Sequence, residues 1–223
     1  MLPWIELDRT DLPQGGVLRL MQRGREFSIK LGVAELMTSR LFGSEEALAT
    51  LAAEALAGRA RPRVLIGGLG MGFTLRAALK ALPAEAKIVV AELVPAVVRW
   101  ARGPMAELFG DCLDRPGVEI VEADVATLIG APAAAYDAIL LDVDNGPEGM
   151  TQATNDGLYS VRGLAAARAA LRPGGVLAVW SQGPDRTFAA RFAKSGFQVE
   201  EKRVRAGGSH GGSRHVIWLG VRR

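Results

Sequence analysis

The sequence predicts an α/β protein built on a doubly wound, mostly parallel sheet of seven strands. Along most of the 223 residues, apolar runs typical of buried strands alternate with helical segments. This alternation indicates a parallel sheet that helices cover on both faces. Two further observations complete the prediction. Two final strands around a glycine-rich segment indicate an antiparallel edge hairpin, and short alternating runs at the start indicate a small β meander.

The first part of the chain is expected to form a small antiparallel β region. Apolar and polar residues alternate there in short runs around the turn signal Gly24. The three expected strands cover residues 17–21, 27–31 and 35–37. We therefore divide the chain into an N-terminal β-hairpin region at residues 1–43 and a sheet domain at residues 44–223.

A helix is expected at the start of the sheet domain. Ser44 is a residue type that accepts hydrogen bonds from the first free backbone N–H groups of a helix. Glu45 and Glu46 then place negative charge at the positive end of the helix. These signals predict a helix over residues 45–56 that ends at Gly58.

The rest of the domain alternates strands and helices in a regular order. The expected strands cover residues 64–66, 87–92, 118–121, 136–142, 176–180, 197–205 and 215–221. The expected helices cover residues 73–82, 95–102, 163–171 and 186–195. Because proline and glycine terminate helices, the run Arg172-Pro173-Gly174-Gly175 is expected to separate the helix before it from the strand after it.

Composition limits the classes of function. The formal net charge is +3 and the pI about 9.3, but acidic residues are interspersed with the basic ones, which argues against a nucleic acid substrate. No stretch approaches the roughly 18 apolar residues that would cross a bilayer, so a cytoplasmic enzyme is expected. Cys112 is the single cysteine, which excludes an internal disulfide and favours a buried, inert thiol.

A glycine-rich turn follows the first strand of the main domain and leads into a helix. Its sequence is Gly67-Gly68-Leu69-Gly70-Met71-Gly72. Glycines have no Cβ atom, so they allow a tight turn and let a ligand approach the backbone and the helix N-terminus. Such a turn can also serve only to pack a strand against a helix, so it predicts a nucleotide site only together with other features.

Carboxylates follow the next three strands, at the edge where open α/β sheets bind their ligands. They are Glu92, Asp124, Asp142 and Asp144. Glu92 could accept hydrogen bonds from both hydroxyls of a ribose, and Asp124 could accept one from an adenine amino group. An NAD enzyme would share the glycines and Glu92, but the acid after the third strand favours S-adenosylmethionine. The two histidines, His210 and His215, are assigned to the surface or to packing.

Several motifs together resemble one known family. The matching segments are residues 64–76, Glu92 and its neighbours, Asp124, residues 136–142, Gly146-Pro147, residues 158–160 and residues 171–175. Over roughly residues 63–181 they look like the spermidine synthase family, within the Rossmann-like class I S-adenosylmethionine-dependent methyltransferase fold. The leading strands are similar to the small N-terminal β region of that family.

The resemblance implies a role for each of these positions. The implied donor-binding residues are Gly68, Gly70, Met71, Gly72, Glu92, Leu93, Asp124, Val125 and Asp142. Glu92 would hold the ribose, Asp124 and its neighbours the adenine, and the glycines the methionine-derived tail. Asp142 or Asp144 would act catalytically, by orienting the attacking amine and accepting its proton. The implied acceptor-binding residues are Asp144, Tyr159 and Trp180.

The chain departs from the family pattern at several positions. Met71 stands where spermidine synthases have an aspartate beside the amino group of the donor, and Trp180 stands where they commonly have glutamine. The Tyr-Gln pair of the family is replaced at Ser44-Glu45. Trp180 either closes the core or walls the acceptor pocket. The segment 148–157 is longer than the usual gating loop and is either a lid or an ordinary surface loop.

The expected activity is group transfer from a sulfonium to a small-molecule acceptor. The acceptor could be an amine, and no metal is expected to take part. Such a reaction needs an aligned nucleophile and the removal of one proton. The missing acid at Met71 favours methyl transfer from S-adenosylmethionine. The alternative is an aminopropyltransferase that uses decarboxylated S-adenosylmethionine and a polyamine, and the second alternative is a catalytically silent nucleotide-binding scaffold. Because the N-terminal strands could pair between subunits, a homo-oligomer, either a dimer or a tetramer, is expected.

Overall fold

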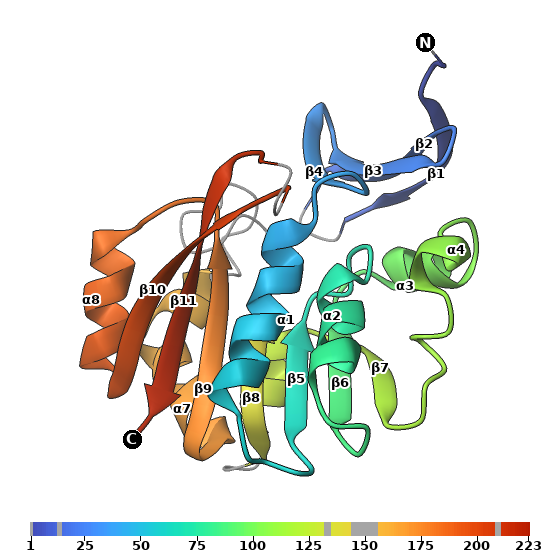
Figure 1. The fold of residues 1–223 in the computed structure, drawn as a ribbon. Coiled ribbons are helices and arrows are strands. Elements are labelled where there is room, and N and C mark those ends of the chain that lie inside the picture. Colours follow the sequence, from blue (N-terminus) through green and yellow to red (C-terminus); the bar gives the residue numbers. More distant parts are fainter. Residues whose placement is uncertain (1, 13–14, 132–134, 144–155, 208–210) are drawn as a thin grey trace.

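The computed structural model describes residues 2–12, 15–131, 135–143, 156–207 and 211–223. Within these residues the chain forms two sheets, a four-stranded antiparallel sheet at the N-terminus and a seven-stranded mixed sheet. In Figure 1 the small sheet stands above one end of the large one. This architecture confirms the predicted fold class.

The large sheet has parallel strands at its centre and an antiparallel pair at one edge. Its parallel strands are β5 (Arg63–Gly67), β6 (Lys87–Glu92), β7 (Val118–Glu122), β8 (Tyr136–Leu141) and β9 (Leu171–Ser181). The remaining strands are β10 (Phe197–Arg205) and β11 (Arg214–Arg222). The order across the sheet is β10-β11-β9-β8-β5-β6-β7. β11 is antiparallel to both of its neighbours, which confirms the predicted edge hairpin.

Helices cover both faces of this sheet and create two apolar cores. On one face lie α1 (Gly43–Ala55), α2 (Phe73–Ala81) and α3 (Pro95–Arg102); on the other lie α5 (Val125–Ile129), α7 (Val161–Ala170) and α8 (Arg186–Lys194). Val64 and Ile66 belong to the first core and Leu65 to the second. Successive strand residues point to opposite faces, so the apolar run of β5 serves both cores.

The N-terminal sheet packs onto the large domain and is not a separate body. Its strands are β1 (Ile5–Asp11), β2 (Val17–Arg23), β3 (Glu26–Leu31) and β4 (Ala34–Thr38), in that order across the sheet. Leu18, Leu20 and Ile29 belong to the same apolar core as α2 and α3. The sequence predicted β2, β3 and β4, but β1 was missed because its residues are mostly charged and exposed.

The start of α1 corrects one prediction. The helix begins at Gly43 with Phe42 as its N-cap, and Ser44 lies inside it, fully buried. The hydroxyl of Ser44 contacts Glu45 and His215 instead of capping the helix. The Ser44 hydroxyl is therefore engaged by a residue that is distant in the sequence, and it does not cap the helix as the local sequence predicts.

Other differences have local causes. α7 does end at Ala170, but β9 begins at Leu171 and includes the run 172–175, which was expected only to separate helix and strand. The pairing with β8 shifts register between Tyr136 and Ala138, and this irregularity accommodates the extra residues. The short helices α4 (Ala106–Phe109), α5 and α6 (Asp156–Tyr159) were not predicted, because segments of four or five residues have too little periodicity.

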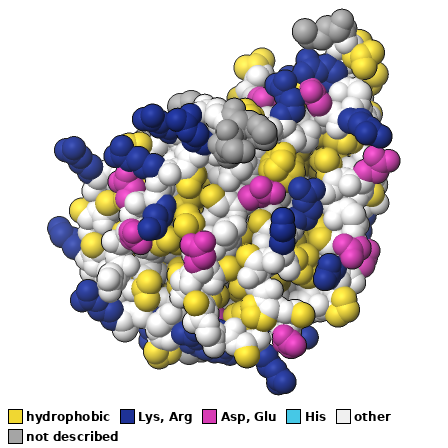
Figure 2. Space-filling model, in the orientation of Figure 1, with side chains coloured by type: hydrophobic (Ala, Val, Ile, Leu, Met, Phe, Trp, Pro, Cys, Tyr) yellow, Lys and Arg dark blue, Asp and Glu magenta, His cyan; other side chains and the backbone are white. Residues whose placement is uncertain are grey.

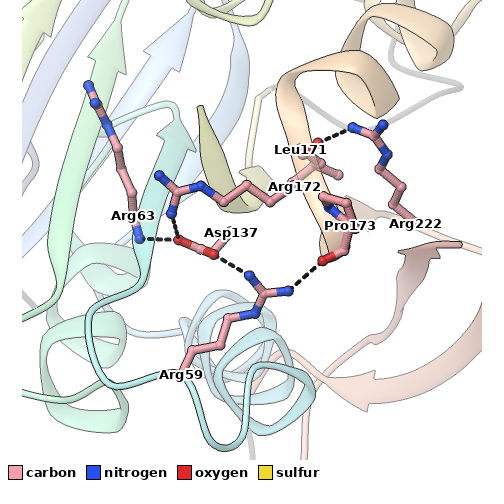
Figure 3. Close-up of polar contacts among 7 residues, drawn as sticks. All are labelled: Arg59, Arg63, Asp137, Leu171, Arg172, Pro173 and Arg222. Atoms are coloured by element: carbon pink, nitrogen blue, oxygen red, sulfur yellow. Dashed lines mark hydrogen bonds and ion pairs between the residues drawn. The ribbon is translucent and has the colours of Figure 1, made fainter. Parts of the chain in front are cut away.

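A buried carboxylate ties together the amino-terminal ends of the central strands (Figure 3). Asp137, near the start of β8, is 3% exposed and accepts hydrogen bonds from the backbone N–H of Arg63 and the guanidinium of Arg172, both at 2.7 Å. The guanidinium of Arg59 also donates to it, and reaches the carbonyl oxygen of Pro173 at 2.7 Å. These contacts hold the ends of β5, β8 and β9 at the edge of the sheet opposite Asp142.

The surface carries mixed charge. On the face drawn in Figure 2, basic and acidic side chains are interspersed and form no continuous basic patch. Across the described residues, none of the helices combines the length and the apolar character that a membrane crossing requires.

Candidate functional site

A cavity of about 160 Å³ opens at the carboxyl ends of β5, β6 and β8 and beside the turn that follows β7. One wall consists of residues that follow these strands: Gly68, Gly70, Glu92, Asp124 and Asp142. The opposite wall is apolar and includes Leu18, Ile29, Leu31, Leu36 and Met37 of the N-terminal sheet. The structure thus gathers two of the glycines and three of the predicted carboxylates around one cavity, whereas Asp144 lies outside the described residues.

The glycines of the turn have different reasons to lack a side chain. Gly68 has a φ of 91°, and a Cβ atom there would collide with the backbone carbonyl oxygen of Asp142. Gly72 has a φ of 76° and is the N-cap of α2, where a Cβ atom would collide with the ring of Phe109. Gly68 therefore shapes the cavity, whereas packing requires Gly72, which is not part of the cavity wall.

Two methionines cover the outer part of the turn. The side chain of Met71 is fully buried, and its backbone N–H donates to the Sδ atom of Met37 at 3.2 Å. Met37 also lies against Gly70, where a Cβ atom would be 2.6 Å from its terminal methyl group. The side chain of Met71 is therefore packed in the core while the thioether of Met37 occupies the adjoining wall, and the assignment of Met71 to the donor site remains untested.

Glu92 is a buried carboxylate at the end of β6. It is 7% exposed, and its two oxygens accept hydrogen bonds from the backbone N–H groups of Leu69 at 2.9 Å and Val94 at 2.8 Å. Burial raises the pKa of Glu92, while these backbone donors act in the opposite direction. The backbone N–H groups of Gly70 and Leu93 also lower the pKa of Glu92, and the carboxylate borders the cavity.

Asp124 has a structural role of its own. It is the N-cap of α5, and its side chain accepts a hydrogen bond from the backbone N–H of Ala126 at 2.8 Å. The side chains of Val125, which is buried, and Leu93, which is 41% exposed, complete this part of the cavity. The N-cap role by itself explains why an aspartate stands at this position. The contact between Asp124 and adenine remains untested.

Asp142 connects the first cavity to a second one of about 250 Å³. Asp142, Leu36 and Met37 line both cavities. The hydroxyl of Thr74 donates to Oδ2 of Asp142 at 2.6 Å. Burial nevertheless raises the pKa of Asp142 to about 6, so this carboxylate can exchange a proton near neutral pH.

Glu45 is a second carboxylate in the second cavity, and the sequence analysis assigned it only to the first turn of a helix. Burial and the neighbouring charge of Asp142 raise the pKa of Glu45 to about 7, although the Ser44 hydroxyl opposes this shift. The sequence signal that could have found it is its position where the family has a Tyr-Gln pair. A departure from a family pattern can mark an altered site as well as a lost one.

His215 also lines this cavity, in addition to the packing role that the sequence predicts for it. Its Nδ1 atom lies 2.9 Å from Oγ of Ser44, and Ser44 Oγ–H donates to Oε2 of Glu45 at 2.7 Å. The rings of His215 and Trp180 meet edge to face with centroids 4.7 Å apart. The sequence could not reveal this contact, because 171 residues separate Ser44 from His215. His210 lies outside the described residues.

The two aromatic residues that the sequence assigns to the acceptor, Trp180 and Tyr159, lie in different parts of the fold. Trp180 is 9% exposed, belongs to the core beneath α1 and also lines the second cavity, so both of its proposed roles agree with its position. Tyr159 is 2% exposed and meets the ring of Phe188 edge to face in the core on the other side of the sheet. Its side chain lines neither cavity, and the predicted contact of Tyr159 with the acceptor remains untested.

The fold and the two cavities define a class: a Rossmann-like α/β protein with a cavity at the carboxyl ends of its strands, covered by an N-terminal β region. No protein family model matches the chain. The sequence is 35% identical over 127 residues to polyamine aminopropyltransferases of Mycobacterium tuberculosis and Mycobacterium bovis. The match covers 56% of this chain but only 23% of the length of each relative.

Solved structures resemble the chain over nearly all of its length. The spermidine synthase of Thermotoga maritima has a TM-score of 0.78 at 19% identity, over 98% of this chain and 73% of that one. A spermidine synthase in complex with the transition-state analogue AdoDATO also has a TM-score of 0.78 at 19% identity, over 98% of this chain and 72% of that one. A probable spermidine synthase of Corynebacterium glutamicum has a TM-score of 0.66 at 17% identity, over 97% and 79%. Together with the sequence matches, they confirm the predicted resemblance to the spermidine synthase, or polyamine aminopropyltransferase, family.

Proposed function

We propose that this protein transfers an aminopropyl group from decarboxylated S-adenosylmethionine to a small amine. The observation that carries this proposal is the meeting of two cavities at Asp142. The first cavity has the glycine turn and carboxylates that suit an adenosine-bearing donor, and the second has acids and an indole that suit a cationic acceptor. The relatives favour this alternative over the methyl transfer that the sequence analysis preferred.

On the donor side, we infer that Glu92 accepts hydrogen bonds from the ribose hydroxyls. Its oxygens are held by two backbone N–H groups, so the carboxylate is already oriented before a ligand arrives. Asp124 with Val125 would border the adenine. The apolar side chains of the N-terminal sheet would cover the donor from the other side and exclude water.

On the acceptor side, we assign Asp142 to orient the attacking amine and receive its proton. An amine must be neutral to attack, and a carboxylate whose pKa is raised to about 6 can take up that proton near neutral pH. The nitrogen lone pair then forms a bond to the aminopropyl carbon while the carbon–sulfur bond breaks, and a neutral thioether leaves. Catalysis would come from alignment of the two reactants across the shared carboxylate, and Trp180 would border the acceptor.

Isothermal titration calorimetry with decarboxylated S-adenosylmethionine tests the donor site. Glu92→Ala should weaken binding at least about 10-fold, because a buried hydrogen-bonding partner is lost. Glu122→Ala is the matched control, because Glu122 ends the neighbouring strand β7 but is exposed and lines neither cavity. Equal affinity in the Glu92 variant and the wild type would refute the ribose assignment.

Turnover separates the candidate functions. Wild-type protein with decarboxylated S-adenosylmethionine and putrescine should release a thioether, and Asp142→Asn should lose turnover with little change in donor affinity. Methyl transfer is the second candidate, and Met71 favours it because no acid stands there for the free amine of a decarboxylated donor. Preference for whole S-adenosylmethionine in both assays would support it. Binding of either donor without turnover of any amine would support a silent scaffold.

We also propose how the protein assembles and where in the cell it works. We infer a homo-oligomer, a dimer or a tetramer, because β1 is an edge strand with exposed apolar residues such as Ile5, at 60%. Analytical ultracentrifugation tests this inference, and a monomer across the micromolar range would contradict it. The prediction that the protein works in the cytoplasm, on a small acceptor and not on nucleic acid, is tested by fractionation and by the turnover assay.

A further inference from the structure

A hydrogen-bonded chain runs from the second cavity into β11. Ser44 Oγ lies 2.7 Å from Oε2 of Glu45 and 2.9 Å from Nδ1 of His215. Ser44 is fully buried, whereas Glu45 and His215 are partly exposed and both line the cavity. Neither donor binding nor the attack on the donor explains why a serine should join these two titratable groups.

The hydroxyl of Ser44 has one proton, which fixes how the three groups can be arranged. When Glu45 is ionised, Ser44 donates to it, and His215 must donate its Nδ1–H to Ser44. When Glu45 is protonated, the carboxyl can donate to Ser44, and Ser44 then donates to a bare Nδ1, so His215 carries its proton on Nε2. The tautomer of His215 therefore reports the charge of Glu45.

We propose that Glu45, Ser44 and His215 form a proton path that removes the proton lost by the attacking amine; this inference rests on the proposed function. The N–H bond of the acceptor ammonium breaks, and its proton reaches the carboxylate of Glu45, directly or through Asp142 in the same cavity. With Glu45 protonated, His215 takes up a proton from water at Nε2 and releases its Nδ1 proton to water, which gives the second arrangement. The Glu45 proton then passes to Ser44 Oγ while the hydroxyl proton of Ser44 passes to the bare Nδ1 of His215. The Nε2–H proton leaves to water, which restores the first arrangement, so that one proton per turnover has moved from the amine to water.

The surrounding charges favour this direction of transfer. Glu45 faces Asp142 at the end of β8 and Glu46 on its own helix, and both negative charges raise its affinity for a proton. Glu35 of β4 lines the same cavity from the other side. Burial lowers the pKa of His215, so the imidazole releases a proton readily after receiving one. Trp180, which meets the imidazole at its edge, is uncharged.

Nuclear magnetic resonance of ¹⁵N-histidine-labelled protein tests the path without any turnover. The chain has two histidines, so a His210→Gln variant identifies the signals of His215. As the pH falls from about 8 to about 6, His215 should change from the Nδ1–H to the Nε2–H tautomer. Glu45→Gln should abolish this change, and the control Glu46→Gln should keep it. One tautomer throughout in the wild type, or an unchanged transition in Glu45→Gln, would overturn the proposal.

Kinetics test whether the path serves catalysis. His215→Asn retains a hydrogen-bonding partner for Ser44 but cannot carry a proton, and Ser44→Ala breaks the connection. With decarboxylated S-adenosylmethionine and putrescine, each variant should lower kcat about 10-fold or more at neutral pH with an unchanged KM for the donor. Free imidazole should restore part of the kcat of His215→Asn, but it should not restore the kcat of Ser44→Ala to the same extent, because the connection to Glu45 is broken there; the pH at which kcat falls on the acid side should shift in Ser44→Ala. Unchanged kcat and pH profile in both variants would refute a role in catalysis.

The two experiments separate failure of the path from failure of the proposed function. If the wild type turns over and the variants equal it, the path is refuted and the transferase proposal stands. If the wild type binds the donor but does not turn over, the transferase proposal fails, and the path fails with it as a catalytic device. Donor affinity equal to that of the wild type verifies that each variant is folded.

Discussion

Removal of the carboxylate of Asp137 should destabilise the protein strongly without affecting the site. Asp137→Ala deletes three interactions of a buried charge, made with Arg59, Arg63 and Arg172. Hydrogen bonds to a charged group contribute roughly 1.5–3 kcal/mol each. The side chains of Arg59 and Arg172 are 31% and 44% exposed, so solvent screens their share. We therefore expect a loss of about 3 kcal/mol in the free energy of unfolding, or about 6–12 °C in Tm for a chain of this size.

Urea unfolding followed by circular dichroism measures this loss. The matched control is Asp114→Ala, because Asp114 is 75% exposed in its ion pair with Arg102 and should contribute less than about 1 kcal/mol. At low temperature, Asp137→Ala should bind the donor as the wild type does, because Asp137 lies at the opposite edge of the sheet from Asp142. A loss below about 1 kcal/mol in the free energy of unfolding would show that the three contacts of Asp137 do not hold the strand ends together.

Three further predictions concern the turn, the acids and the thiol. Gly68→Ala should abolish donor binding in calorimetry, because its Cβ atom would meet the carbonyl of Asp142, whereas Gly72→Ala should lower the Tm but leave the donor affinity of folded protein intact. The raised pKa of Glu45 means that the folded state binds a proton that the unfolded state has released, so stability falls as the pH rises through about 4.5 to about 7. Glu45→Gln should therefore gain stability over the wild type at about pH 8, and the gain should vanish near pH 4 in urea titrations. Cys112 is buried with its pKa raised to about 11, so a thiol reagent should label it only after unfolding; rapid labelling of native protein would contradict this.

The first cavity could largely be anticipated from the sequence. Parallel strands end at one edge of the sheet, so Glu92, Asp124 and Asp142 had to approach one another once the strands were identified. The backbone conformation of Gly68 was likewise expected from a glycine between a strand and a helix. These inferences depend on local pattern and on the regular geometry of α/β sheets.

The second cavity could not be anticipated in the same way. Glu45 carries an ordinary helix-start signal, and His215 follows a glycine-rich segment, so neither residue has a local pattern that indicates a site. Tyr159 is the opposite case, because a motif match assigned it to the acceptor site and only the tertiary structure shows that its side chain packs in a core. Asp144 and residues 148–155, most of the segment 148–157 for which a lid was one interpretation, lie outside the described residues.

By itself, the sequence determined the order of strands and helices, the doubly wound sheet and the carboxylates at its rim, because periodic burial and glycine turns are encoded within short segments. Only the tertiary structure decided that Ser44 faces a histidine, that Met37 covers the turn and that Asp142 joins two cavities. Those contacts arise between α1, β4 and β11, which are distant in the chain. Their register depends on how the two apolar cores pack as a whole, and no short segment carries that information.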